Sequence, residues 1–320
     1  MTPSETLVEL PVSTGEVGGA PLAAQRANWL RALWIELRPS QWVKNLFVFA
    51  PVFFSERLFV PAVLWRSLMA FGCFCAVSSS IYLLNDLMDC AQDRLHPEKR
   101  HRPLAAGLLK AWTAQVALVG LLGVSLAGAA ALSGAFAMIL AGYWGLNLWY
   151  SLRLKHLVII DVFAIATGYL LRVIGGAVVI GVAMSTWLLI CTTLVALFIA
   201  LCKRRHELVL LEEDAQGHRQ VLGDYPIPFL DAMIGIITAS ALVSYTLYTV
   251  SEDIMAKFGS PGLLLTVPFV LYGFFRYLYL VHRHEEGGDP AQSIMTDRPM
   301  LANLMLWVLT AGIILYGASR

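Results

Sequence analysis

The residues best suited to chemistry in this sequence form an acidic run at the end of a long apolar stretch. The apolar stretch 64–84 stops at Asn85, and three carboxylates follow, Asp86, Asp89 and Asp93. Residues three and four positions apart lie on one face of a helix, so we expect the carboxylates to point the same way, with Asn85 at their edge. Like charges on one face repel each other unless a cation lies among them. A donor set made only of oxygen atoms suits Mg²⁺ bound together with substrate phosphates.

A basic cluster follows the acidic run and supplies groups of the opposite charge. Its members are Arg94, Lys99, Arg100 and Arg102. Guanidinium and ammonium groups bind phosphate oxygens, so the two runs together predict a diphosphate site. The alternative is a solvated acidic helix end followed by a basic loop. Carboxylates at membrane depth are costly and usually mark function, which favours the site.

The composition indicates the kind of scaffold that holds these residues. The chain has 320 residues, of which 58% are hydrophobic and 14% are charged. These proportions predict an all-α, polytopic membrane protein with a single transmembrane domain. A net charge of +1 gives no reason to expect a nucleic acid as partner. The five cysteines are odd in number and lack zinc-like spacing, so we interpret them as packing residues.

The first 45 residues are expected to precede the transmembrane domain. Residues 1–25 are rich in Ser, Thr, Glu, Gly and Pro and predict a disordered cytosolic tail rather than a signal peptide. Residues 26–38 carry Trp29 and Trp34 on an apolar helical stripe, so this helix either lies in the membrane interface or packs on the protein. We expect residues 26–45 to form an interfacial amphipathic helix and a polar lead-in.

About nine apolar stretches of spanning length make up the expected transmembrane domain, 46–320. They are 46–60, 64–84, 111–127, 135–150, 157–182, 186–201, 229–250, 262–281 and 301–316. Lysine and arginine collect in alternate connections, so the positive-inside rule places the N-terminus and the polar motifs on the cytoplasmic side. A site on that face could take a soluble substrate from the cytosol and a lipid from the bilayer.

Other candidate residues lie where further apolar stretches reach the same side. They are Lys44, Tyr150, Arg153, Lys155, Asp161, Lys203 and Arg204. Asp161 lies just inside a span, so it either pairs with a basic residue or joins the site. The basic residues are either phosphate ligands or anchors at the membrane edge. Arg172 lies deep in the same span as Asp161, and we expect a structural partner near the far side, Glu252 or Asp253.

The acidic run, N-D-x-x-D-x-x-x-D at Asn85, resembles the UbiA superfamily of intramembrane prenyltransferases. Three longer strings resemble one branch of it, the bacterial decaprenyl-phosphate phosphoribosyltransferases. They are R-P-x-Q-W-x-K-N at 38–45, H-P-x-K-R-x-R-P-x-A-x-G at 96–107 and Y-S-x-x-L-K at 150–155. The pairs Lys203-Arg204 and Asp297-Arg298 also fall where that branch has such pairs. The resemblance covers the chain from about Arg38 onward.

The branch implies an activity and a location. Its members move a 5-phosphoribosyl group from phosphoribosyl pyrophosphate to a long polyprenyl phosphate and release pyrophosphate. The product feeds arabinan assembly in the cell wall. The resemblance therefore implies a Mg²⁺-dependent enzyme in the bacterial inner membrane, with a UbiA-like helical bundle and an active site facing the cytoplasm.

Carried onto this sequence, the resemblance assigns roles to the candidate residues. Mg²⁺ would be held by Asn85, Asp86, Asp89 and Asp93. Lys99 and Arg102 would contact the same diphosphate. The sugar phosphate and the lipid phosphate would be shared among Lys44, Asn45, Tyr150, Arg153, Lys155, Lys203 and Arg204. Asp161 would orient a ribose hydroxyl, Tyr150 or a lysine.

One region departs from the wider superfamily. Aromatic prenyltransferases carry a second motif, D-x-x-x-D, after the sixth span, whereas this chain has K-R-R-H-E at 203–207. A basic, phosphate-binding surface fits that string better than a second metal pair. Two alternatives stay open: transfer of a prenyl chain from prenyl diphosphate to an aromatic acceptor, and, in another class, a cation transporter. Assembly as a homo-oligomer is left open too.

Overall fold

The computed structural model describes residues 22–97, 99–213, 225–252, 254, 262–283 and 296–317. Throughout these ranges the regular elements are helices, which confirms the all-α class. In chain order they are α1 (Leu22–Glu36), η1 (Pro39–Phe49), α2 (Ala50–Phe54), α3 (Pro61–Asp93), η2 (Lys99–His101), α4 (Ala111–Leu132), α5 (Gly134–Leu152), η3 (Leu154–His156), α6 (Ile160–Ile180), α7 (Thr186–Glu213), α8 (Ile227–Thr249), η5 (Gly262–Thr266), α10 (Val267–Arg283) and α12 (Arg298–Gly317). The tail at 1–21 lies outside the described residues.

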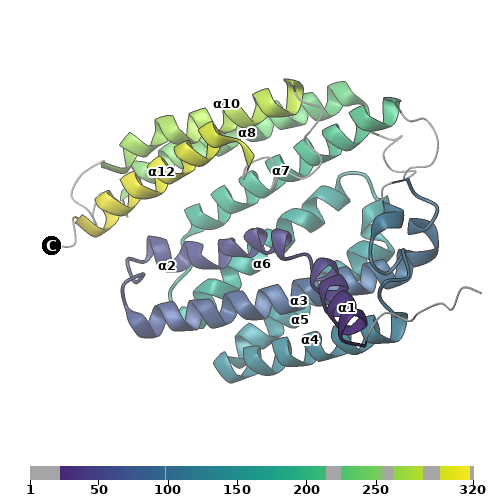
Figure 1. Ribbon diagram of the computed structural model, residues 1–320. Helices are drawn as coiled ribbons and strands as arrows, with labels where there is room; N and C mark the ends of the chain where they lie inside the picture. Colours follow the sequence, from purple (N-terminus) through teal and green to yellow (C-terminus); the bar gives the residue numbers. More distant parts are fainter. Residues whose placement is uncertain are drawn as a thin grey trace, which may run out of the picture.

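The long helices form two groups that lie side by side (Figure 1). One group contains α7, α8, α10 and α12, and the other contains α2 to α6. The central helix is α6, because it packs against α3, α5 and η1 in one group and against α7 in the other. Any side chain at the start of α6 is therefore positioned by both halves of the protein.

Seven helices in the described part of the chain are long and apolar enough to cross a membrane. They are α3, α4, α6, α7, α8, the η5–α10 unit and α12. The spans of α4, α8, the η5–α10 unit and α12 are mostly exposed, as expected for helices that face lipid, whereas α3 and α6 are mostly buried inside the bundle. The prediction of a polytopic membrane protein is confirmed, although the described residues contain seven such helices rather than nine.

The first expected span, 46–60, is not among these seven helices, and its bounds differ in the structure. The chain there forms the 3₁₀ segment η1 and then α2, which ends at Phe54. A 3₁₀ segment is narrower than an α-helix and approaches a neighbour closely. It does so at Gly176 of α6, where a Cβ atom would overlap the Val48 carbonyl oxygen. Close backbone packing and a buried polar residue, Asn45, therefore override the apolar pattern.

This contact gives a matched pair of stability predictions. Gly176→Ala is expected to destabilise the fold by about 1–3 kcal/mol, because the added methyl group meets backbone that cannot rotate away. Gly72→Ala in α3 is the control, since no atom lies within 4 Å of its added Cβ. Alanine favours helix more than glycine, so the control is expected to be neutral or slightly stabilising. Thermal unfolding in detergent measures both, and equal melting temperatures would contradict the packing argument.

Candidate active site

Two of the three aspartates meet around one cationic atom. Asp86 and Asp93 lie in the last turns of α3, and both are buried. Nη1 of Arg102 lies 2.9 Å from Oδ1 of Asp86 and 2.6 Å from Oδ2 of Asp93. Arg102 follows α3 in the basic loop, so the loop folds back onto the helix that precedes it. The structure thus places a positive charge between two carboxylates.

A second arginine, Arg38, binds Asp86 from the N-terminal side. Its Nη2 donates to Oδ1 at 2.6 Å and to Oδ2 at 2.7 Å, and its guanidinium lies over the Tyr82 ring at 5.1 Å. Arg38 has a φ of 52°, the left-handed conformation, which costs a non-glycine residue roughly 1–2 kcal/mol. Sequence reasoning missed Arg38 as a site residue, although it begins the string R-P-x-Q-W-x-K-N.

Asp89 and Asn85 have different surroundings. Within the described residues, Asp89 has no hydrogen-bonding or ionic partner, and no three His, Cys, Asp or Glu side chains gather closely enough to hold a metal. The expected convergence of three carboxylates is therefore seen for two. The side-chain oxygen of Asn85 is buried without a hydrogen-bond partner in that same part of the chain.

These residues fit Mg²⁺. The donors are all oxygens, two carboxylates already share one cation, and an amide oxygen nearby in the helix is unsatisfied. Mg²⁺ is usually bound by one or two carboxylates, with the remaining positions filled by water and substrate phosphates. Asp86, Asp93 and Asn85 would hold the ion, and the guanidinium groups of Arg38 and Arg102 would be available to phosphate oxygens.

Glu36 is a buried carboxyl group next to this site. One of its oxygens accepts a hydrogen bond from the Leu104 amide at 3.3 Å, and the side chain is 2% exposed. Burial raises the pKa of Glu36 to about 7, and the charge of Asp86 adds to the rise. Arg38, the Leu104 amide and Arg102 act in the opposite direction. Glu36 therefore ties α1 to the basic loop and titrates near neutral pH.

The raised pKa of Glu36 predicts a pH-dependent stability. Between its ordinary value of 4.5 and about 7, the folded protein holds a proton that the unfolded chain has lost. Stability from this group is therefore full below pH 4.5 and is lost as pH rises through 7. In metal-free buffer, Glu36→Gln is expected to raise the melting temperature at pH 8 and leave it unchanged at pH 4.5. A variant that melts below the wild type at pH 8 would contradict this.

A second polar cluster lies where α5, α6 and α7 meet. Nε of the buried Arg204 donates to Oδ2 of Asp161 at 2.6 Å, and its Nη2 donates to the Tyr150 hydroxyl at 2.7 Å. Its Nη1 binds Glu207 one turn further along α7. Asp161 thus pairs with a basic residue, one of the two outcomes expected for it. Because these partners occupy the donors of Arg204, this residue positions Tyr150 and Asp161 rather than binding a phosphate directly.

Tyr225 completes this cluster and was missed in the sequence. Its hydroxyl donates to Oδ1 of Asp161 at 2.8 Å and accepts the amide of Ile159, a residue with a φ of 70°. Burial, opposed by the hydrogen bond from the Ile159 amide and assisted by the one to Asp161, raises the pKa of Tyr225 to about 12, so the hydroxyl stays a donor at neutral pH. A tyrosine before Pro226 in a polar loop gives no signal that it reaches a residue 64 positions away.

Arg172 lies in a buried network. Its expected partner was Glu252 or Asp253, and the structure shows that Glu252 is not its partner. Its Nε donates to Oδ1 of Asn45 at 2.7 Å and its Nη2 to the Tyr143 hydroxyl at 2.6 Å. The guanidinium also lies over the rings of Tyr143 and Tyr169, whose faces attract cations. Asp253 lies outside the described residues. Asn45, a predicted phosphate ligand, is fully buried in this network.

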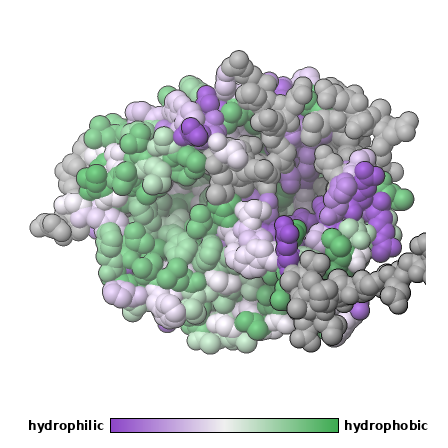
Figure 2. Space-filling model, viewed as in Figure 1, coloured by the Kyte–Doolittle hydropathy of each residue, from purple (hydrophilic) through white to green (hydrophobic). Residues whose placement is uncertain are grey.

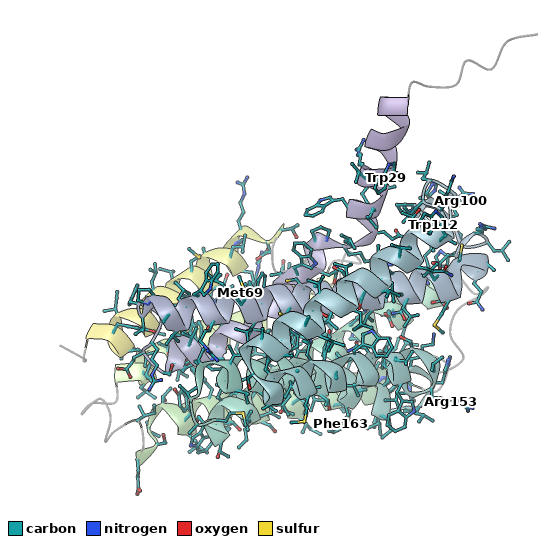
Figure 3. The ribbon with its side chains drawn as sticks, turned by 90° about the horizontal axis from the view of Figure 1, so that it is seen from below. Trp29, Met69, Arg100, Trp112, Arg153 and Phe163 are labelled. Atoms are coloured by element: carbon teal, nitrogen blue, oxygen red, sulfur yellow. The ribbon has the colours of Figure 1, made fainter. Side chains whose placement is uncertain are left out.

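The remaining basic candidates lie at the periphery. Lys99 and Arg153 are exposed, whereas Lys44, Lys155 and Lys203 are half-buried. Lys44 donates to Gln41, and Lys203 lies 3.8 Å from Glu207. Arg100 and Arg153, which belong to two different loops, lie at the same end of the bundle (Figure 3). Hydrophilic side chains gather at that end of the face seen in Figure 2, and hydrophobic ones cover most of the remainder.

Comparison with known proteins identifies the family. Residues 46–305 match the UbiA prenyltransferase family. The chain belongs to this family. It is 32% identical to the decaprenyl-phosphate phosphoribosyltransferase of Mycolicibacterium smegmatis, over 92% of this chain and 96% of that protein. The protein of the same name from Mycobacterium tuberculosis is 31% identical, over 89% of this chain and 95% of the relative.

A solved structure confirms the UbiA fold. The UbiA homolog from Archaeoglobus fulgidus bound to GPP and Mg²⁺ superimposes with a TM-score of 0.67, at 17% identity, over 89% of this chain and 99% of that one. The resemblance inferred from the acidic run and the longer strings is therefore confirmed. This UbiA-family chain is an integral membrane protein.

Proposed function

We propose that this UbiA-family protein transfers a 5-phosphoribosyl group from phosphoribosyl pyrophosphate to a polyprenyl phosphate and releases pyrophosphate. The observation that carries the proposal is the pair Asp86–Asp93 around one guanidinium nitrogen, at the polar end of an apolar bundle. Two carboxylates that can hold a divalent ion, together with the guanidinium groups of Arg38 and Arg102, suit a diphosphate. The relatives named decaprenyl-phosphate phosphoribosyltransferase support the sugar as the group transferred.

In this proposal the metal site combines the acidic run with the donor's diphosphate. Asp86, Asp93 and the Asn85 oxygen would hold Mg²⁺, with Asp89 a further candidate ligand. When bound, Mg²⁺ neutralises the charge that develops on the leaving pyrophosphate. Arg38 and Arg102 would donate to the same phosphate oxygens and so place fixed positive charge where negative charge develops.

The chemical step needs little from the protein beyond position and charge. An oxygen of the lipid phosphate forms the new bond to C1 of the ribose, and the bond from C1 to the pyrophosphate oxygen breaks. The lipid phosphate is already anionic, so we assign no general base. Lys44, Lys99, Arg153, Lys155 and Lys203 are candidates for the remaining phosphates. Arg204, Asp161 and Tyr225 would hold the Tyr150 hydroxyl in place, and Asn45 would act through the Arg172 network.

The location follows from the same arrangement. The apolar chain of the acceptor would lie against the bilayer-facing helices, with its phosphate at the polar end. We place the protein in a bacterial inner membrane with the site facing the cytoplasm, because the basic loops lie at that end. The product would serve assembly of the cell wall.

A labelled-donor assay tests the proposal. Purified protein in liposomes is supplied with Mg²⁺, polyprenyl phosphate and phosphoribosyl pyrophosphate labelled in the ribose. Label is expected to appear in the lipid extract and to depend on the acceptor. The second candidate is transfer of a prenyl chain, which the family and the GPP-bound fold relative favour. Product formed only from prenyl diphosphate and an aromatic acceptor would overturn the first proposal and support the second.

A further inference from the structure

The helix α1 has one face packed on the protein and another left uncovered. Ala32 and Glu36 are buried, with Ala32 packed against Leu83 and Leu104 in a small apolar cluster. The uncovered face carries three large apolar side chains, Leu30, Trp34 and Ile35, which are 53%, 55% and 51% exposed. Arg31 is exposed on the same face. This face needs a partner that accepts both apolar side chains and a cation.

The direction of α1 indicates what that partner is. In Figure 3 the long helices run across the view, whereas α1 runs steeply to them and stands out from the bundle. A helix that crosses the direction of the spanning helices lies along the membrane plane. Trp29 on α1, Trp112 and Arg100 all lie toward the same end of the bundle in this view. Trp112 is 64% exposed at the start of the spanning helix α4.

We propose that the uncovered face of α1 lies on the phospholipid headgroups of the leaflet at the site's end, and that this contact seats Arg38 on Asp86. Tryptophan is enriched at headgroup level, where its ring is apolar and its N–H is polar, and arginine pairs with lipid phosphate. The helix α1 stands at the end of the bundle where the exposed Trp112 lies, so its uncovered face is continuous with the surface that Trp112 shares. That continuity favours lipid over a second copy of the chain.

The connection from α1 to the site is short and tightly held. The helix ends at Glu36, and the Leu37 carbonyl accepts a hydrogen bond from the Ser79 hydroxyl at 2.8 Å. The next residue is Arg38, whose left-handed backbone turns its guanidinium onto Asp86. Since one residue separates the helix from this arginine, displacement of α1 moves Arg38. The strained φ is maintained only while its surroundings hold it.

Photo-crosslinking tests the lipid contact without relying on any activity. A benzophenone amino acid is placed at Trp34 of the full chain in liposomes of radiolabelled phosphatidylcholine and phosphatidylglycerol. Crosslinking to lipid is expected to match that at Val119, which is exposed on α4, and to exceed several-fold that at Arg100, which is exposed in η2. A crosslinked dimer of the chain, or lipid yield no higher than at Arg100, would overturn the proposal.

A coupling experiment tests the link to Arg38, and it depends on the proposed phosphoribosyl transfer. The triple variant Leu30→Ser, Trp34→Ser, Ile35→Ser is expected to lower kcat/KM several-fold in liposomes. In an Arg38→Lys background the same change is expected to lower it less than about twofold, because both changes disturb one contact. Equal losses in the two backgrounds, or no loss in the wild type, would overturn the coupling. Phenylalanine at Trp34 should preserve activity.

Discussion

Asp86→Asn is expected to lower kcat for phosphoribosyl transfer by about 10³-fold at saturating Mg²⁺. Asp86 is 2% exposed, and both of its oxygens already bind cationic groups. Asparagine keeps the shape but removes the negative charge that a divalent ion requires, and removal of one electrostatic contact to a leaving group commonly costs 10²–10³-fold. The labelled-donor assay across a Mg²⁺ titration measures the effect.

Asp89→Asn in the same helix is the matched control. Asp89 has no ionic partner among the described residues and is only partly buried. The decrease in kcat for Asp89→Asn is expected to be tenfold or less, which is the size of effect expected from removing a peripheral charge. Near-full turnover by Asp86→Asn at saturating Mg²⁺, with the fold intact by thermal melting, would remove the metal-site proposal. A larger loss for Asp89→Asn than for Asp86→Asn would reverse the assignment.

Arg204→Met is expected to destabilise the protein by about 3–5 kcal/mol, because it leaves the buried carboxylate of Asp161 without its ionic partner. Both side chains are almost completely buried, at 3% and 1% exposed. The hydrogen bond to Tyr150 is lost as well. Thermal unfolding in detergent, followed by tryptophan fluorescence, should show a much lower melting temperature.

The neighbour on α7 supplies the control for this prediction. Lys203 is 39% exposed and lies 3.8 Å from Glu207, so Lys203→Met should cost less than about 1 kcal/mol. Adding Asp161→Leu to Arg204→Met should recover part of the lost stability, since the unpaired charge is then gone. Equal destabilisation by Arg204→Met and Lys203→Met would show that the cluster at the start of α6 contributes little to stability.

The acidic run could be predicted because its spacing is local. Asp86 and Asp93 are seven positions apart on one helix, so the helical period alone places them on the same side. The apolar stretches likewise predicted a membrane protein, and the basic loops predicted that the polar motifs lie at the same end of it. The meeting of Arg102 with both carboxylates follows from a short loop that returns to its own helix.

Contacts between distant segments could not be predicted in this way. Arg38 reaches Asp86 across 48 positions, and its left-handed backbone has no glycine to signal it. Tyr225 reaches Asp161 across 64 positions. Residues 46–60 were expected to form a spanning helix because they are apolar, and their first four residues lie instead at the end of η1. Its 3₁₀ form depends on Gly176 and Arg172 of α6, whose proximity only the folded bundle reveals.

The return of Arg102 onto α3 bears on how the protein is made. Asp86 and Arg102 are separated by sixteen positions, so this half of the site can form as soon as α3 and the loop after it leave the ribosome. The half around Asp161 can form only after α7 and Tyr225 have been synthesised, which happens much later. The acidic pair Asp86 and Asp93 therefore depends on a cation that is close in the sequence, whereas Asp161 obtains its ionic partner, Arg204, only once the second group of helices has been made.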